Sequence, residues 1–372
     1  MTRAGHSRVP ARLHLIPRFC RGGAQQTIID LARAFPDVET IVGTADGDGL
    51  PALERAGVPW VSLPLFPSNP TNALRSVLAI HRLTRDRPIE LIHSHHRFSS
   101  LVGHAVSRWT GIPLVCTVHD LAGGHRLLSR LALGGVVTVF SDAVRAHLVD
   151  QFGVKNDRIY GTAMGLTPMA APTSAEVTDI RQLAGCGTDD TVVGFCGRLV
   201  AEKGPDLLLQ AATTVLSEYP RTRFWIIGDG ELRSDLESLT ETLQISSRVT
   251  FFGWRNDFQK LLGAADLVVV PSRREGFGRV AAEGLLLKKP VIAARIGSLP
   301  ELIRDGDNGL LVPPNDAAAL ATAIGLLVGS EQKRREMGRA ASTTAERQFS
   351  IDAMRRDFEA VYSSSLDSRH RQ

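Results

Sequence analysis

The sequence predicts two doubly wound α/β domains joined by a hinge, with a cleft between them. A chain of 372 residues is too long for one ordinary domain and about right for two. Short apolar segments alternate with helical patterns along nearly the whole chain. The apolar segments are hydrophobic on both faces, which is typical of strands in a parallel sheet that helices cover on both sides.

The individual elements follow from these patterns in chain order. Strands are predicted in the first half at 12–16, 39–42, 90–94, 113–118 and 136–140, and in the second half at 191–196, 223–228, 248–253, 266–271, 290–294 and 309–312. Helices are predicted between them at 24–35, 72–86, 98–109, 142–151, 204–218, 230–243, 257–264, 279–287 and 316–328. Two polar helices, 331–347 and 351–364, are predicted to follow.

A segment rich in Pro, Ala, Ser and Thr, TPMAAPTSAEV (167–177), separates the two halves and predicts a linker. We therefore expect an N-terminal Rossmann-like domain over 1–168, a linker over 169–188 and a C-terminal Rossmann-like domain over 189–348. The last segment, 349–372, is expected to be a helix and is a candidate to cross back to the N-terminal domain.

Composition and cysteine usage indicate a water-soluble globular protein. Apolar residues make up 43% of the chain and charged residues 22%, and no apolar run approaches the roughly 18 residues of a membrane span. The basic N-terminus contains only a very short apolar stretch, LHLI, so no signal peptide is predicted. The four cysteines show no metal-ligand spacing, and their mostly apolar surroundings favour reduced thiols in the cytoplasm.

Positive charge is concentrated in the first half of the chain. Residues 1–165 contain 18 Lys and Arg against 12 Asp and Glu, whereas the remainder contains 25 against 27. This imbalance fits either ordinary solvated helix faces or a surface that meets an anionic partner, such as lipid headgroups or a phosphate-bearing acceptor. Nucleic acid fits poorly, because the basic residues are scattered, without aromatic interleaving or a recognisable binding motif.

A loop with two cations is predicted after the strand 191–196. In open parallel sheets, ligands bind beyond the carboxyl ends of the strands. The loop reads GRLVAEKG and contains Arg198 and Lys203. A planar guanidinium and a point-like ammonium together suit two adjacent phosphates. On its own, the same loop also fits a surface turn with two solvated cations.

The stretch PSRREGFGRVAAEG (271–284) places two carboxylates around a glycine-containing turn after a buried strand. Gly276 and Gly278 would let the backbone approach a ligand closely, and a helix beginning near Gly278 would direct free N–H groups at an anion. Glu275 in the loop and Glu283 in the helix can accept hydrogen bonds from sugar hydroxyls. The alternative is an exposed loop acid and a partly buried structural acid.

The first half has its own polar residues at strand ends. Gly22 and Gly23 begin a helix after the first strand, which predicts either an amide-rich ligand loop or a simple turn. The run HSHH (93–96) has poor spacing for a structural zinc site, and no cysteine is near. His119 follows another strand and could donate to a phosphate or sugar hydroxyl, or serve only as a structural histidine.

Taken together, these motifs resemble those of the family 4 glycosyltransferases, which have the GT-B architecture of two facing Rossmann-like domains. The motifs stand in order along nearly the whole chain, as RGGAQ (21–25), TVHD (117–120), GRLVAEKG (197–204), VTFFGW (249–254), PSRREGFGRVAAEG (271–284) and GSLPELIRDGDNGLLVPPND (297–316).

The resemblance implies a retaining enzyme that uses a nucleotide-diphosphate sugar and needs no metal or other cofactor. It implies that Arg198 and Lys203 hold the donor diphosphate, that Glu283 binds the ribose hydroxyls, and that Glu275 contacts the donor sugar. The two cations and a helix dipole would then neutralise the departing nucleotide diphosphate, which is the role of a metal in other enzymes.

The same resemblance assigns roles to the remaining candidate residues. Backbone groups at Gly276, Phe277 and Gly278 would assist donor binding. Gly22 and Gly23 would shape the loop beside the phosphates, and His119 would sit near the transferred sugar. The candidate catalytic residues are therefore His119, Glu275, Arg198 and Lys203.

The expected reaction is the transfer of a hexosyl group from a UDP- or GDP-linked sugar to an acceptor hydroxyl. The expected acceptor is a saccharide or lipid-linked intermediate of bacterial polysaccharide or lipopolysaccharide synthesis, with no role for nucleic acid. Two alternatives stay open at this point, namely a nucleotide-sugar epimerase of similar architecture and a non-catalytic nucleotide-sugar-binding subunit. An NAD-dependent dehydrogenase is disfavoured, because no GxGxxG follows an early strand.

The excess of arginine in the N-terminal half also predicts where the enzyme works. We expect it in the cytoplasm, with peripheral association at the inner face of the plasma membrane through charge. The arginines that motivate this expectation are Arg75, Arg82, Arg85, Arg87, Arg126 and Arg130.

Overall fold

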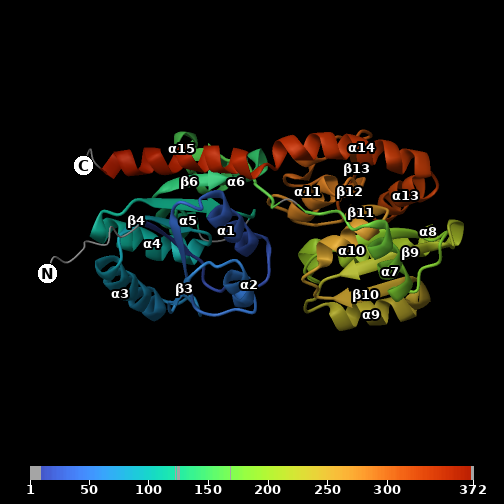
Figure 1. Cartoon of the computed structure of the whole chain (residues 1–372), viewed down its shortest axis with the longest axis horizontal. Helices are drawn as coiled ribbons and strands as arrows, with labels where there is room; N and C mark the ends of the chain where they lie inside the picture. Colours follow the sequence, from blue (N-terminus) through green and yellow to red (C-terminus); the bar gives the residue numbers. More distant parts are fainter. Residues whose placement is uncertain (1–9, 122, 124–125, 168, 370–372) are drawn as a thin grey trace. The chain divides into compact units, whose positions relative to one another are not determined.

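The computed structural model describes residues 10–121, 123, 126–167 and 169–369. The chain forms two compact units (Figure 1). Unit 1 combines the chain up to Thr167 with the C-terminal segment from Phe349, and unit 2 comprises Pro168 to Gln348. Each unit contains one parallel sheet with helices on both faces.

Unit 1 contains a seven-stranded sheet in the order β3-β2-β1-β4-β5-β6-β7. All neighbouring strands are parallel. The strands are β1 (Ala11–Leu15), β2 (Glu39–Thr44), β3 (Trp60–Ser62), β4 (Ile89–Ser94), β5 (Leu114–Val118), β6 (Val136–Val139) and β7 (Ile159–Gly161). The helices are α1 (Gly23–Ala34), α2 (Leu50–Arg55), α3 (Pro70–Asp86), α4 (Arg97–Thr110), α5 (Arg126–Ala132), α6 (Asp142–Phe152) and α15 (Ile351–Arg369), with a 3₁₀ turn at η1 (Asn156–Arg158).

Two hydrophobic layers enclose the sheet of unit 1. Helices α3 to α6 pack on one face, where Ile80, Val106 and Leu148 are buried against the strands. Helices α1, α2 and α15 cover the other face. The C-terminal helix α15 inserts Phe358 and Tyr362 into this second layer, and it lies across β4 and β5.

Unit 2 contains a six-stranded parallel sheet in the order β10-β9-β8-β11-β12-β13. The strands are β8 (Thr191–Cys196), β9 (Thr222–Ile227), β10 (Val249–Gly253), β11 (Leu267–Val270), β12 (Val291–Ala294) and β13 (Gly309–Val312). The helices are α7 (Ser174–Leu183), α8 (Pro205–Glu218), α9 (Arg233–Thr242), α10 (Phe258–Ala264), α11 (Arg279–Leu286), α12 (Leu299–Leu302), α13 (Ala317–Val328) and α14 (Glu331–Gln348), with 3₁₀ turns at η2 (Ala201–Lys203) and η3 (Ser246–Arg248).

The predicted fold class is confirmed, since both sheets are parallel and doubly wound. Every predicted strand and helix corresponds to an observed element, with boundaries that differ by a few residues. The sequence prediction did not include β3 and β7, which have only three residues each, or the helices α2, α5, α7 and α12.

The segment 169–188, expected to be a linker, contains helix α7. Thr173 caps this helix by accepting a hydrogen bond from the backbone N–H of Glu176, whose carboxylate accepts one from the N–H of Thr173. Such a capping box fixes the start of a helix. Because α7 packs against α10 and shares its apolar cluster, this part of the segment belongs to the body of unit 2.

Among the described helices, none combines the length and apolar character that a membrane span requires.

Candidate functional site

The strand order of each sheet reverses at one position. In unit 2 this switch lies between β8 and β11, and in unit 1 it lies between β1 and β4. The loops that leave the carboxyl ends of the two strands at such a switch diverge, and ligands of doubly wound sheets bind there. The loops in question in unit 2 are 197–204 and 271–278, which are the two predicted donor loops.

The two donor loops of unit 2 approach each other closely at Gly204. This residue has φ +65°, and a Cβ added to it would lie 2.3 Å from the backbone oxygen of Pro271. Only glycine accommodates both the left-handed backbone and this approach. The backbone N–H of Arg273 donates to the carbonyl oxygen of Glu202 at 2.8 Å, which joins the loops directly.

The side chain of Arg273 fastens the same two loops together. Its guanidinium donates to both carboxylate oxygens of Asp206, at 2.8 and 2.6 Å, and to the carbonyl oxygen of Ala201 at 2.8 Å. Its Nε donates to Oδ1 of Asn315 at 2.7 Å. Burial would raise the pKa of Asp206, but the hydrogen bonds and charge of Arg273 outweigh this effect and hold the pKa below its usual value.

An ion pair between Lys203 and Glu275 lies at the junction of these loops. Nζ of Lys203 is 2.7 Å from Oε2 of Glu275, and Oγ of Ser272 donates to the same oxygen at 3.1 Å. The Glu275 side chain is 12% exposed and that of Lys203 is 26% exposed. An ammonium has three N–H donors, so the ion pair leaves Lys203 able to bind a further anionic oxygen.

Arg198 comes after Gly197 at the end of β8, and it is exposed. Within the described parts of the chain, its guanidinium makes no hydrogen bond or ion pair. It thus differs from Arg273, whose guanidinium donates four hydrogen bonds to protein groups. A fixed backbone with an unengaged guanidinium at a strand end suits the binding of an anion.

Glu283 is nearly fully buried in α11, where it is 3% exposed. Nε of Arg279, one turn earlier, donates to its Oε1 at 3.1 Å. Burial raises the pKa of the Cys196 thiol at the end of β8, and the negative charge of Glu283 raises it further. The carboxylate therefore lies near this strand end. A buried carboxylate with a cationic partner is held in one orientation, which suits the recognition of neighbouring hydroxyl groups.

Helix α11 starts directly at this loop. Gly278 has φ +85° and precedes Arg279, the first residue of the helix. A Cβ at Gly278 would lie 2.6 Å from Cδ2 of Leu299, so the position favours glycine. Gly276 and Phe277 are buried beside it, and the N–H groups of the first helical turn offer donors to an anion.

In unit 1, Gly22 and Gly23 lie where the sequence predicted, between β1 and α1. Gly23 is the first residue of α1 and Gly22 precedes it with an extended backbone at φ 175°. The amide of Gln25 donates to the carbonyl oxygen of Arg18 at 3.2 Å, which folds this loop back on itself.

The histidines of the HSHH run have separate structural roles. His93 bonds to the hydroxyls of Tyr362 and Thr117, at 2.9 and 2.6 Å, and His96 accepts from the first turn of α4. His95 lies between His14 and His119, at 2.9 and 3.0 Å.

Nitrogens of His14, His93 and His95 lie within 4.8 Å of one another, which is a spacing that a metal ion could use. A metal bound there would have to displace hydrogen bonds that these nitrogens already make.

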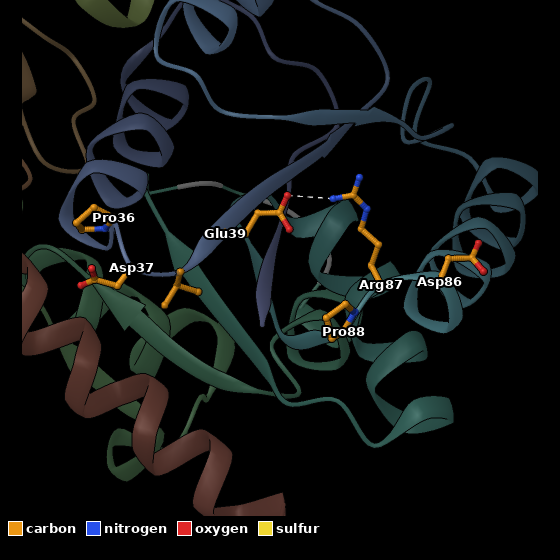
Figure 2. Close-up of a pocket in the computed structure, with 7 residues that line it drawn as sticks. Pro36, Asp37, Glu39, Asp86, Arg87 and Pro88 are labelled. Carbon is orange, nitrogen blue, oxygen red and sulfur yellow. Dashed lines mark hydrogen bonds and ion pairs between the residues drawn. The ribbon is translucent and has the colours of Figure 1, made fainter. Parts of the chain in front are cut away.

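A hollow of about 650 Å³ lies elsewhere in unit 1. It is found at the amino ends of β2 and β4, where Nη1 of Arg87 and Oε1 of Glu39 form an ion pair at 3.0 Å (Figure 2). Parallel sheets bind ligands at the opposite edge, so we do not assign this hollow to the candidate site. Its lining consists of Pro36, Asp37, Val38, Glu39, Asp86, Arg87 and Pro88.

Four residues that organise these groups were not predicted from the sequence, namely Ser272, Arg273, Arg279 and His95 as a partner of His119. The sequence contains a signal for two of them. Arg279 and Glu283 are four residues apart and therefore share a helix face. For His93 and His95, the alternation of a strand places both side chains on one face.

We expect replacement of Arg273 by alanine to loosen the two donor loops. The change leaves Asp206 without its charged partner and lowers the free energy of unfolding by about 1.5–3 kcal/mol. Because the folded-state pKa of Asp206 is lowered, this contribution exists above the unfolded-state pKa and disappears as the pH falls through the folded-state value. Urea unfolding at neutral and acidic pH measures both effects.

The matched control for Arg273 is Arg295, which forms an exposed ion pair with Asp305 at 2.7 Å. Replacement of Arg295 by alanine is expected to change the unfolding free energy by less than about 1 kcal/mol. Equal losses in the two variants would contradict the role assigned to Arg273.

Family relationships agree with this geometry. The chain matches the family described as Glycosyl transferases group 1 over residues 177–344, and the family described as Glycosyltransferase Family 4 over residues 21–160. It is 31% identical to a D-inositol 3-phosphate glycosyltransferase of Corynebacterium aurimucosum, over 74% of this chain and 72% of that protein. It is also 31% identical to the enzyme of the same name from Saccharomonospora viridis, over 87% of this chain and 84% of that protein.

Solved structures share the whole architecture. Anabaena HepE in complex with UDP-glucose matches with a TM-score of 0.86 at 26% identity, covering 95% of this chain and 99% of that chain. WaaG, a glycosyltransferase involved in lipopolysaccharide biosynthesis, shares the fold with a TM-score of 0.75 at 19% identity, covering 95% of this chain and 99% of that chain.

The two Rossmann-like units and their relatives define the class of this protein, which is a glycosyltransferase with the GT-B fold. More specifically, the chain belongs to the family 4 glycosyltransferases, as the motifs in its sequence implied.

Proposed function

We propose that this glycosyltransferase moves a hexosyl group from a nucleotide-diphosphate sugar to an acceptor hydroxyl, with retention of the anomeric configuration. The observation that carries the proposal is the Lys203–Glu275 ion pair at the switch point of unit 2, where the loop of Lys203 also contains Arg198. A UDP-linked donor is favoured over a GDP-linked one, because HepE, which is 26% identical, was solved with UDP-glucose.

The proposed roles follow from the position of each group in unit 2. Arg198 and Lys203 hold the diphosphate and stabilise the negative charge that grows on it as the sugar departs. Glu275, oriented by Lys203 and Ser272, accepts hydrogen bonds from the sugar, and Glu283 accepts them from the ribose. Backbone N–H groups at Gly276, Phe277 and Gly278 add donors at the start of α11. No metal is needed in this scheme.

Residues of unit 1 complete the proposal. Gly22 and Gly23 shape an amide-rich loop beside the phosphates, and His119 contacts the transferred sugar. Unit 1 is the proposed acceptor-binding domain and unit 2 the donor-binding domain. The proposed acceptor is a saccharide or lipid-linked intermediate of bacterial cell-surface glycan synthesis, which is supported by the exposed basic and apolar surface described below.

A panel of nucleotide sugars tests the donor assignment. We expect UDP-hexoses to raise the melting temperature of the protein, and radiolabelled donor to yield glycosylated acceptor whose anomeric configuration NMR determines. Conversion of the donor to its epimer without acceptor would support the epimerase instead. Binding without turnover on lipid-linked, polysaccharide or inositol phosphate acceptors would support a non-catalytic subunit.

The proposal of a lipid-linked acceptor is supported by the surface of α3 and α5, which both pack against α4 (Figure 1). We refer to the exposed side chains of these two helices as the basic apolar face. Its leucines are Leu74, Leu78, Leu127, Leu128 and Leu131, which are 40% to 71% exposed. Its arginines are Arg75, Arg82, Arg85, Arg126 and Arg130, which are exposed and have no ion-pair partner among the described residues. Arg87, at the end of α3, pairs with Glu39 and does not belong to this face.

Apolar side chains between unpaired arginines suit a membrane surface with anionic lipids. We therefore propose peripheral binding at the inner face of the plasma membrane, with the protein otherwise in the cytoplasm.

We expect the protein to co-sediment with vesicles that contain phosphatidylglycerol, and to be released at high salt because the charges are screened. Each replacement of an arginine of this face by alanine is expected to weaken binding by about fivefold, which corresponds to about 1 kcal/mol. Replacement of Leu74 by aspartate is also expected to weaken it. Leu183 on α7 is 88% exposed and serves as the control, since it lies outside the basic apolar face.

Vesicle binding that does not change between low and high salt would count against this mode of association. Equal loss of binding in Leu74→Asp and Leu183→Asp would argue that the leucines of α3 have no special role.

A further inference from the structure

Three histidine side chains of unit 1 form a continuous hydrogen-bonded chain. Nδ1 of His14 lies 2.9 Å from Nε2 of His95, and Nδ1 of His95 lies 3.0 Å from Nε2 of His119. His14 and His95 are only 1% and 4% exposed, and His119 is half-buried. The chain therefore connects the core of the sheet, at β1, to the candidate catalytic residue that follows β5.

The geometry couples the proton positions of the three rings. A neutral imidazole has one N–H donor and one acceptor nitrogen. Because His95 uses both nitrogens in the chain, its tautomer sets the direction of both hydrogen bonds. With the proton on its Nδ1, His95 donates to His119 and accepts from His14, and the proton of a neutral His119 is on Nδ1. With the proton on its Nε2, both directions reverse and His119 holds its proton on Nε2.

The buried part of the chain cannot hold an additional proton near neutral pH. Burial, assisted by the charge of Arg12, lowers the pKa of His14 to about 3. Burial and the neighbouring histidines also lower the pKa of His95 well below its usual value. A proton accepted at His119 would therefore not be passed inward and stored, so the chain transmits a tautomer and not a charge.

A second network lies beside this chain and stays separate from it. Both nitrogens of His93 are bonded to hydroxyl groups, one to Tyr362 and one to Thr117, which in turn bonds to Thr138 at 2.6 Å. The rings of His93 and His95 are 4.2 Å apart, but no hydrogen bond joins them in the described structure. Tyr362 therefore offers a control that affects neighbouring packing without touching the chain.

We propose that His95 is a positioning residue for His119, and that the chain from His14 through His95 holds Nε2 of His119 as an acceptor with its proton on Nδ1. This inference rests on the proposed function. A donor substrate with phosphate and hydroxyl oxygens is bound best where protein groups present N–H donors. When His14 donates to His95 and His95 donates to His119, each N–H bond of the three histidines points toward His119 and hence toward that substrate.

The tautomer is measured directly by ¹⁵N NMR of the full-length protein with labelled histidines, assigned with His119→Gln. We expect a protonated Nδ1 and an unprotonated Nε2 for His119. His95→Asn keeps an amide near the position of Nδ1, which can still donate to His119, so the tautomer should be preserved. His95→Leu removes the donor, so the His119 signals should shift to values averaged over both tautomers.

Turnover provides the second measurement. In His95→Leu we expect kcat to fall on the order of tenfold, as for other residues that orient a functional side chain, and the KM for the donor to change less. His95→Asn should recover most of the lost kcat. Tyr362→Phe should leave the His119 signals and kcat unchanged.

Several results would overturn the positioning role. One is the finding of a proton on Nε2, or on both nitrogens, of His119 in the wild-type protein. Another is that the ¹⁵N signals of His119 do not change in His95→Leu. Stoichiometric binding of added Zn²⁺ with shifted His14, His93 and His95 signals would identify a metal site instead. If the tautomer is as expected but the wild-type protein transfers no sugar, the proposed function fails while the assignment of the chain is supported.

Discussion

Replacement of Lys203 by alanine is expected to lower kcat/KM for sugar transfer by about 10²–10³-fold, the usual effect of removing a group that stabilises developing charge. Lys203 lies beside the position proposed for the diphosphate, where negative charge grows as the sugar bond breaks. Its loss removes this stabilisation and also takes from Glu275 its cationic partner, while the hydrogen bond from Ser272 stays. Most of the loss should therefore appear in kcat, because the charge develops in the transition state.

The control for Lys203 is Lys260, which pairs with Glu176 at 2.6 Å on the surface of the same unit. Replacement of Lys260 by alanine should leave kcat/KM within about twofold, since an exposed ion pair contributes little. A Lys203→Ala variant that is folded, shown by an unchanged circular dichroism spectrum, and as active as Lys260→Ala would refute the proposed role.

The ion pair itself is tested by a double-mutant cycle with Glu275→Gln. If Lys203 and Glu275 act as one unit, the losses in the two single variants will not add, and the double variant will be little worse than either one. Fully additive losses would indicate that each residue contacts the substrate independently.

The architecture and the positions of the loops 197–204 and 271–278 were predictable because strand ends in a parallel sheet share one edge. Arg198 lies in the loop after β8 and Glu275 in the loop after β11, so their positions in the sequence were enough to place them on neighbouring loops. The capping box of Thr173 and Glu176 was also present in the sequence, and it would have identified α7 in the segment expected to be a linker.

Contacts between distant positions were not predictable in this way. Arg273 binds Asp206 and Asn315, which are 67 and 42 residues away. His95 meets His14 across 81 residues. Such pairs depend on the sheet order and on side-chain rotamers, which no local pattern encodes. This is why arginines of the two loops differ in role, with Arg273 bound to protein groups and Arg198 available for an anion.

Replacement of Glu283 by glutamine is expected to raise the KM for the donor by about 10- to 100-fold, with a smaller change in kcat. A ribose hydroxyl keeps its hydrogen bonds to this carboxylate in both the ground state and the transition state, so their loss weakens binding in both. Glutamine keeps one acceptor oxygen, so the change removes about one charge-assisted hydrogen bond of roughly 1.5–3 kcal/mol, which accounts for this magnitude. Isothermal titration with UDP measures the same loss without turnover.

The stability of the Glu283→Gln variant separates donor binding from folding. Glu283 is almost fully buried and paired with Arg279, so removal of its charge leaves a largely buried guanidinium and lowers the free energy of unfolding. A further Arg279→Leu change removes that cation and should recover part of the stability, but it should not recover the affinity for UDP. Recovery of both would mean that Glu283 acts only through the folding of α11, and that the ribose is bound elsewhere.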